Sequence, residues 1–216
     1  MTLETRDVTA TLDGTTSKPY DGTTAAPEGL TLALPGVLEG DTVTVTGTIA
    51  YDTKDVGTGK TITASNLTLT GNDARYYDLA ANDIVENNGS ITAADLSGTV
   101  TITGTAQYNQ QLTASYDPVH DDEQVTYQWN RGDQPISGAI GSTYTLTEAD
   151  IGKSITVTAT ATDSNHTGSV TSTAVTVGKA PQTALTISGL PDKVYVGDQF
   201  TLTASGFELS LYGMML

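Results

Sequence analysis

The chain has 216 residues, a formal net charge of −16 at pH 7 and no cysteine. Such a negative charge repels phosphate backbones and anionic lipid surfaces, which argues against nucleic-acid binding. No apolar run approaches the ~20 residues of a membrane helix, so we expect no membrane insertion. The absence of cysteine excludes disulfides, thiolate metal sites and thiol nucleophiles.

The first region alternates between apolar and hydroxyl-bearing residues, a pattern typical of half-buried strands. The alternating segments are 42–46, 61–63 and 66–70. Glycine tolerates positive φ and Asp side chains form local hydrogen bonds, so turns are predicted at 39–41 and 57–60. Segment 71–75 is the one predicted helical turn, and it is too short to count as an element.

The second region begins after Leu96 and has a different pattern. Strands are predicted near 98–104, 110–116, 124–130, 143–146, 153–162 and 169–177. The third of these carries Trp129, the only tryptophan, and an Asp-x-Gly corner at Asp150 and Gly152 precedes the fifth. Six or seven short strands in some eighty residues fit a two-sheet sandwich.

These patterns predict an all-β chain of three parts: a β domain at 1–93, a β-sandwich at 94–179 and a truncated further domain at 180–216. The last part offers two predicted strands, at 185–187 and 200–204, and two strands cannot close a core. Residues 207–216 continue no strand pattern. Periodicity leaves open whether the first domain is a sandwich or a β-grasp-like sheet.

Four blocks of the first region, in this order, resemble the YDG-type repeat of bacterial surface proteins and large adhesins, over about residues 8–93. The blocks are 17–24, 36–43, 54–60 and 67–71. The Pro-Tyr-Asp-Gly sequence in the first block is most simply a turn, with Tyr20 packed over the core.

The second region resembles the bacterial Ig-like repeats of the same proteins, over about residues 95–178. The matching blocks are 127–129, 136–139, 142–146 and 150–153. The cysteine pair of antibody domains is absent, so the sandwich must depend on packing. The blocks at 187–191 and 194–198 look like the start of another Ig-like repeat. We therefore expect tandem Ig-like β-sandwich domains.

The two resemblances imply a segment of a bacterial cell-surface protein, extracellular or at the cell wall, with no catalytic residues and no cofactor. The first residues lack the pattern of a signal peptide, so either the protein stays inside the cell or this is an internal piece of a longer exported chain. The resemblances favour the second, with the segment expected to be monomeric. The expected role is a non-catalytic spacer that projects a distal head. Alternatives are an adhesive module for a glycan or host protein, and accessory β-domains of a secreted carbohydrate-active enzyme.

Two loop sequences are candidate sites. Arg131, Gly132 and Asp133 spell the tripeptide that integrins recognise, although a Gly-Asp turn belongs in this hairpin in any case and is the simpler interpretation. The acidic loop that holds Asp117, Asp121, Asp122 and Glu123 could bind Ca²⁺, although a solvated acidic turn is the simpler interpretation. The two histidines, His120 and His166, fall in polar loops, and no spacing indicates a catalytic triad.

Aromatic and lysine side chains give two further hypotheses. Tyr76 and Tyr77, with Tyr51, could form a platform for sugars, although strand alternation would bury one of the neighbouring pair. Isopeptide bonds occur in some surface-protein domains, and Lys18, Lys54 and Lys60 are the candidates in the first region. All three lie beside turn residues, so we expect them to be exposed.

Overall fold

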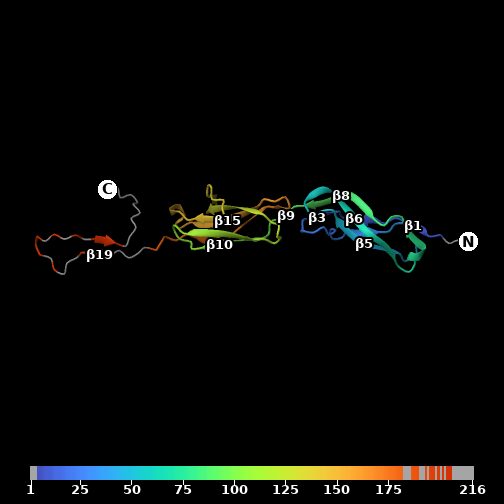
Figure 1. Cartoon of the computed structure of the whole chain (residues 1–216), viewed down its shortest axis with the longest axis horizontal. Helices are drawn as coiled ribbons and strands as arrows, with labels where there is room; N and C mark the ends of the chain where they lie inside the picture. The colour runs from blue at the N-terminus through green and yellow to red at the C-terminus, as the bar shows by residue number, and fades with distance from the viewer. Residues whose placement is uncertain are drawn as a thin grey trace.

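The computed structural model describes residues 4–181 and, beyond them, residues 186–189, 193, 195–197, 199, 201 and 203–205. In these residues the fold is all-β, as expected, with two 3-10 turns, η1 (Ala74–Tyr76) and η2 (Glu148–Asp150). Two β units follow each other along the long axis of the molecule (Figure 1). None of the described helical segments has the length and apolar character needed to cross a membrane.

The first unit is built on a mixed four-stranded sheet in the order β3-β8-β6-β5. Its strands are β3 (Ser17–Pro19), β8 (Ile84–Thr92), β6 (Gly57–Thr70) and β5 (Thr44–Tyr51). β3 is parallel to β8, and the other neighbours are antiparallel. Two small pairs complete the unit: β2 (Thr11–Asp13) with β4 (Thr31–Ala33), and β1 (Arg6–Val8) with β7 (Tyr77–Leu79).

The turn predicted at 57–60 is wrong, because these residues begin the long strand β6. The register against β8 shifts on either side of Lys60, and Gly59 has φ 66°. Glycine at positive φ marks a β-bulge as readily as a turn, and the sequence pattern cannot separate the two. The turn predicted at 39–41 is confirmed, since the Asp41 amide donates to the Leu38 carbonyl at 3.1 Å.

The segments predicted at 61–63 and 66–70 are parts of this same strand. Asn66, at the start of the second segment, adopts φ 55°, and the register against β5 shifts between Thr46 and Thr48. Gly47 lies opposite this bulge, where a Cβ atom would lie 2.6 Å from Leu67 Cδ2. Glycine at this position therefore allows the two strands to pair through the irregularity.

The second unit contains two sheets. One has the order β10 (Thr99–Gly104), β11 (Gln111–Asp117), β14 (Thr143–Thr145). The other has the order β13 (Gln134–Pro135), β12 (Val125–Arg131), β15 (Ser154–Ala161), β17 (Ser169–Thr171), and β18 (Val175–Thr176) also pairs with β15. Five predicted strands lie within one residue of these bounds. The sixth, 169–177, is split into β17 and β18 around the buried Ser172.

One hydrophobic core joins the two sheets in a sandwich-like arrangement. Val100, Leu112 and Ala114 come from the first sheet, and Trp129, Ile155, Val157 and Ala159 come from the second. Trp129 is completely buried and its indole Nε1 donates to the Gly141 carbonyl at 2.9 Å. The indole therefore fills the core without leaving its donor unpaired.

The chain passes from one unit to the other within three residues. Thr92 ends β8 in the first sheet, and β9 (Ala94–Asp95) already pairs in parallel with β16 (His166–Thr167) of the second unit. In the tail, β19 (Thr186–Ser188) pairs antiparallel with β20 (Thr203–Ser205). These overlap the strands predicted at 185–187 and 200–204, whereas residues 207–216 lie outside the described residues.

Candidate functional site

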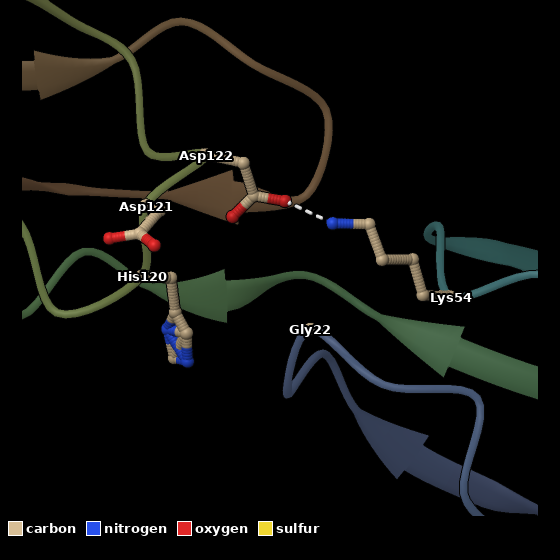
Figure 2. A pocket seen from close by; sticks show the side chains of 5 residues that line it. All are labelled: Gly22, Lys54, His120, Asp121 and Asp122. Carbon is tan, nitrogen blue, oxygen red and sulfur yellow. Dashed lines mark hydrogen bonds and ion pairs between the residues drawn. The ribbon is translucent and has the colours of Figure 1, made fainter.

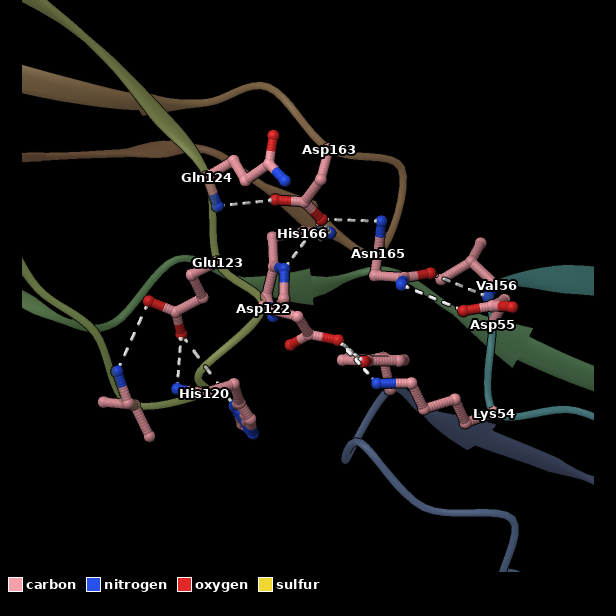
Figure 3. Close-up of polar contacts among 12 residues, drawn as sticks. Lys54, Asp55, Val56, His120, Asp122, Glu123, Gln124, Asp163, Asn165 and His166 are labelled. Carbon is pink, nitrogen blue, oxygen red and sulfur yellow. Dashed lines mark hydrogen bonds and ion pairs between the residues drawn. The ribbon is translucent and has the colours of Figure 1, made fainter.

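The joint between the two units brings together polar side chains from both of them. The first unit contributes Tyr20, just after β3, and the loop between β5 and β6; the second contributes the loops before β12 and after β15 (Figure 3). Backbone hydrogen bonds connect the linker to the second unit. The Ala94 amide donates to the Asn165 carbonyl at 3.0 Å, and the Leu96 amide donates to the Thr167 carbonyl at 2.7 Å.

Asp122 connects the units through two side chains of the first unit. Its carboxylate accepts a hydrogen bond from Lys54 Nζ at 2.8 Å and another from the Tyr20 hydroxyl. The hydrogen bonds from Lys54 and Tyr20 lower the pKa of Asp122 to about 2. Burial, together with the Asp122 carboxylate, raises the pKa of Tyr20. We call Tyr20, Lys54 and Asp122 the polar latch.

A shallow cavity of about 380 Å³ adjoins the polar latch, lined by Gly22, Lys54, His120, Asp121 and Asp122. Figure 2 shows Lys54 reaching across from the first unit towards Asp122, while Asp121 points away from this contact. The Lys54 side chain is 44% exposed and that of Asp122 is 36% exposed. Water can therefore reach this ion pair, and its contribution to stability is small.

Asn165 makes the second polar contact across the joint. Its Oδ1 accepts from the Val56 amide at 3.0 Å, and its Nδ2 donates to Asp55 Oδ1 at 3.2 Å. Asp163 holds this loop in shape, because its carboxylate accepts from the backbone amides of Gln124, Asn165 and His166. Burial opposes ionisation of Asp163, but its hydrogen bonds outweigh burial and lower its pKa.

The two histidines, which the sequence places in separate polar loops, meet at this joint. The ring centroids of His120 and His166 are 5.6 Å apart, and the Tyr20 ring lies edge-on to His166 at 5.2 Å. Sequence reasoning missed this pair. The signal lies in the strand order: β12 pairs antiparallel with β15, Val125 opposite Ala161, so the loops before and after them share one end of the unit.

Glu123 completes the cluster of possible cation ligands. One ligand atom from each of His120, Glu123 and His166 can be chosen so that all lie within 4.8 Å of one another. Two imidazole nitrogens and a carboxylate oxygen can coordinate a divalent transition metal. Within the described part of the chain, this is the one such group of three or more His, Asp or Glu side chains.

The four carboxylates of the Ca²⁺ hypothesis do not converge in this way. Asp117 and Asp121 are exposed, and Asp122 belongs to the polar latch. Only 1% of the Glu123 side chain is exposed, and its carboxylate accepts hydrogen bonds from the Tyr116 hydroxyl and from the Val119 and His120 amides. Calcium binding by this loop stays a prediction.

Arg131, of the Arg-Gly-Asp sequence, has a partner inside its own unit. Its Nε donates to Asp150 Oδ1 at 2.7 Å, so the guanidinium is held against the molecule. Gly132 has φ 57° at the first position of a two-residue hairpin loop, where glycine is favoured, and Asp133 is exposed. The hairpin accounts for the glycine and Asp150 accounts for the arginine.

The tyrosines follow the predicted alternation and do not form one platform. Tyr51 and Tyr77 are each 4% exposed, whereas Tyr76 is 40% exposed. The Tyr77 hydroxyl donates to Asp41 at 2.6 Å and accepts from the Leu38 amide at 3.0 Å. Tyr76 alone offers a ring face, and the Arg75 guanidinium lies 4.6 Å from its centroid.

The expectation that the three lysines are exposed is wrong for Lys18, which is only 6% exposed. Its Nζ donates to Asp21 Oδ1 at 2.7 Å and to the Thr23 carbonyl at 2.9 Å. These partners compensate for burying the ammonium group, which is why it can lie beneath a turn. The Lys60 side chain is also largely buried, at 9% exposed, and Lys54 is exposed as expected.

Comparisons with known proteins identify one part of the chain. No curated protein and no solved structure matches the chain. The sequence model of the YDG domain matches residues 4–84. The sheet of the first unit extends beyond this match, since β8 ends at Thr92. Residues 4–84 of this chain are a YDG domain, as the four sequence blocks predicted.

Proposed function

We propose that residues 4–179 are a non-catalytic spacer segment of a bacterial cell-surface, adhesin-like protein, which holds a distal head away from the cell. The observation that carries this proposal is the joint, where two residues separated by a single position are hydrogen-bonded to different units. Thr92 O accepts from the Tyr20 amide of the first unit at 2.8 Å, and Ala94 donates to Asn165 of the second. Only Ala93 separates these anchors.

A linker this short leaves little freedom for the units to bend. We expect bending about Ala93 to disturb two sets of side-chain contacts as well: the polar latch and the contacts of Asn165 with Val56 and Asp55. The units are placed end to end (Figure 1), so each one adds its own length to the chain. A stiff, extended series is what a spacer needs.

The finer features of this proposal rest on resemblance and charge. The second unit resembles bacterial Ig-like repeats, which occur with YDG-type repeats in surface arrays. The net charge of −16 makes neighbouring copies repel each other and so favours an extended, unaggregated array. We therefore propose an extracellular location at the cell surface or wall, as part of a longer exported and monomeric chain.

Spin-label distances test the stiffness of the joint. The chain lacks cysteine, so replacing the exposed Glu28 and Thr101 with cysteine places one label on each unit. A spacer predicts a narrow distance distribution, which should broaden when Asn165→Ala and Asp122→Ala are combined. A broad distribution in the parent protein would contradict the proposal, and solution scattering provides an independent measurement.

A second candidate function is adhesion to a glycan, favoured by one surface of the first unit. A cavity of about 300 Å³ is lined by Glu4, Arg6, Leu38, Asp41, Tyr76 and Tyr77. Leu38 and the Tyr76 ring are exposed there, at 52% and 40%. An aromatic face beside charged groups suits a sugar. Saturable glycan-array binding that Tyr76→Ala removes and Tyr108→Ala retains would favour adhesion over a pure spacer.

The third alternative, accessory β-domains of a secreted carbohydrate-active enzyme, predicts a catalytic domain encoded in the same gene. The spacer proposal predicts an exported protein with a signal peptide upstream and a wall anchor downstream. Sequencing the full gene decides between these two.

A further inference from the structure

We propose that His120, Glu123 and His166 form a binding site for a divalent transition-metal cation of the Zn²⁺ class at the joint between the two units. This inference does not depend on the spacer function. It starts from three side chains that the fold brings together from two loops of the second unit (Figure 3).

The spacing of the ligand atoms fits a small cation. His120 Nδ1 lies 3.8 Å from Glu123 Oε1, and the chosen ligand atoms of all three residues lie within 4.8 Å of one another. Ligands about 2.1 Å from Zn²⁺ at tetrahedral angles are roughly 3.4 Å apart. Small side-chain rotations would therefore complete the coordination without moving the strands.

Two buried nitrogens in the cluster have no hydrogen-bond partner. These are His120 Nδ1 and His166 Nε2. Only 1% of the His166 side chain is exposed, and His166 belongs to the three-residue cluster. A buried polar atom without a partner destabilises the fold. A cation at the centre of the cluster would satisfy both nitrogens at once.

The residues around the cluster orient the imidazole of His166 as in known metal sites. His166 Nδ1 is 2.8 Å from Asp163 Oδ1, and the Asp163 carboxylate is itself fixed by the Gln124 and Asn165 amides. When Nδ1 carries the proton for this hydrogen bond, the lone pair of Nε2 is left to bind a metal. A carboxylate behind a histidine in this way fixes the ring and increases its basicity.

Glu123 is fixed in a comparable way. One carboxylate oxygen accepts hydrogen bonds from the Tyr116 hydroxyl and the Val119 amide. The other, Oε1, accepts from the His120 amide at 3.2 Å and is the oxygen that faces the His120 ring. Two of the three ligands, Glu123 and His166, are therefore positioned before any metal binds, which reduces the ordering that binding must impose.

The ligand set selects the class of cation. Two imidazoles and one carboxylate suit Zn²⁺, Co²⁺ or Ni²⁺, whereas Ca²⁺ and Mg²⁺ prefer oxygen ligands alone. Three protein ligands leave a fourth position, which water can occupy. The Tyr20 ring of the first unit lies 5.2 Å from the His166 ring and 6.1 Å from the His120 ring, so it covers one side of the cluster.

Binding would affect the joint, because both metal-binding loops also contact the first unit. The loop of His120 and Glu123 carries Asp122 of the polar latch, and the loop of His166 carries Asn165. A cation that ties these loops together would hold their contacts with the first unit in place. Metal binding is thus expected to narrow the range of angles between the units.

The test is calorimetric titration of Zn²⁺ into the full chain, without an affinity tag, together with the visible spectrum of the Co²⁺ form. The chain has two histidines and no cysteine, so imidazole binding can come only from His120 or His166. We expect one Zn²⁺ per chain and the intense absorption of tetrahedral Co²⁺. His120→Ala, Glu123→Gln and His166→Gln should each weaken binding by about tenfold or more.

Matched controls separate this site from general attraction to an acidic surface. Asp13→Asn removes an exposed carboxylate from β2 and should leave the affinity unchanged. Asp163→Asn removes the residue that positions His166 and should weaken Zn²⁺ binding by about tenfold while leaving the stoichiometry at one. Circular dichroism identifies any variant that fails to fold, and His120→Ala, in a partly exposed loop, is the substitution most readily tolerated.

Three results would overturn the inference. The first is absence of both Zn²⁺ heat and Co²⁺ absorption. The second is Zn²⁺ binding that survives His120→Ala combined with His166→Gln. The third is a parallel titration in which Ca²⁺ binds to this cluster and Zn²⁺ does not. The spin-label experiment fails or succeeds independently, because the joint can be stiff without a cation and a cation can bind at a flexible joint.

Discussion

Asp150 and Asp122 are surrounded by similar chemistry but hold different parts of the molecule together. Asp150 accepts hydrogen bonds from Arg131, from the Tyr144 hydroxyl at 2.8 Å and from the Thr147 amide and hydroxyl, each at 2.7 Å. Asp122 likewise accepts from a cation and a tyrosine, Lys54 and Tyr20. Asp150 is completely buried within one unit, whereas Asp122 is partly exposed between two.

This difference in burial determines how much each carboxylate contributes to the free energy of unfolding. A buried carboxylate with four hydrogen bonds is expensive to disturb, because its partners cannot turn to water. An exposed one adds little free energy, since water replaces the lost contact. We therefore expect Asp150 to stabilise a fold and Asp122 to restrict the angle between two units that are already folded.

The largest expected effect is that of Asp150→Ala on the second unit. It removes the partner of Arg131 and the N3 member of the capping box of η2, and we expect a loss of about 3 kcal/mol of unfolding free energy. Fluorescence of Trp129, the only tryptophan, reports urea unfolding of this unit. Asp133→Ala, at an exposed site, should change stability by no more than about 0.5 kcal/mol. Equal effects would contradict this contrast.

Acid should weaken the same contacts. Burial raises the pKa of Asp150, but hydrogen bonds from Arg131 and Thr147 outweigh it, and the net pKa is lowered. A carboxyl whose pKa is lower in the folded chain stabilises the fold above its unfolded pKa of about 3.9, and this contribution is lost as pH falls through the folded value. Trp129-monitored unfolding should show this loss below about pH 4, and less of it in Asp150→Asn.

A smaller effect on stability is expected for Asp122→Ala, in spite of its two partners. Because water reaches the Lys54–Asp122 pair, neither unit should lose more than about 1 kcal/mol. The distance distribution between labels at positions 28 and 101 should nevertheless broaden. Asp121→Ala, the exposed neighbour, is the control and should leave the distribution unchanged. A large loss of stability without broadening would show that Asp122 acts within its own unit.

The smallest expected effect is that of salt. At about 1 M salt the Debye length is about 3 Å, so the exposed Lys54–Asp122 pair should weaken while the buried carboxylate of Asp150 keeps its contacts. We expect a slight broadening of the label distances and no shift in the unfolding midpoint attributable to Asp150. Lys54→Gln should remove the salt dependence of the label distances. If the label distances still respond to salt in this variant, the response comes from charges other than the Lys54–Asp122 pair.

Much of the second unit could be predicted, because alternation and turn residues are local signals. Five of its strands lie within one residue of the predicted bounds, and Trp129 lies in the core. In the first unit the same reasoning failed where glycine permits a bulge: residues 57–60 begin a strand at a place where a turn was predicted. A sequence pattern indicates which φ values a residue tolerates. It does not indicate whether a positive φ will form a turn or a bulge against a partner strand.

The candidate site was hardly predictable, because its residues belong together only through strand pairing. His120 and His166 lie in different loops, and β12 must pair with β15 before these loops meet. Lys18 and Tyr20 show the same limit. Local turn signals suggested an exposed lysine and a tyrosine over its own core, whereas Lys18 is buried beside Asp21, and Tyr20 also contacts the second unit.

The sequence by itself determined the all-β character, most strand positions of the second unit and the YDG domain, because each depends on residues close together in the chain. Only the tertiary structure decided the joint. Its contacts pair residues about a hundred positions apart, such as Tyr20 with Asp122 and Val56 with Asn165. Such pairs depend on strand order and on how one unit is placed against the next, and neither is encoded in local periodicity.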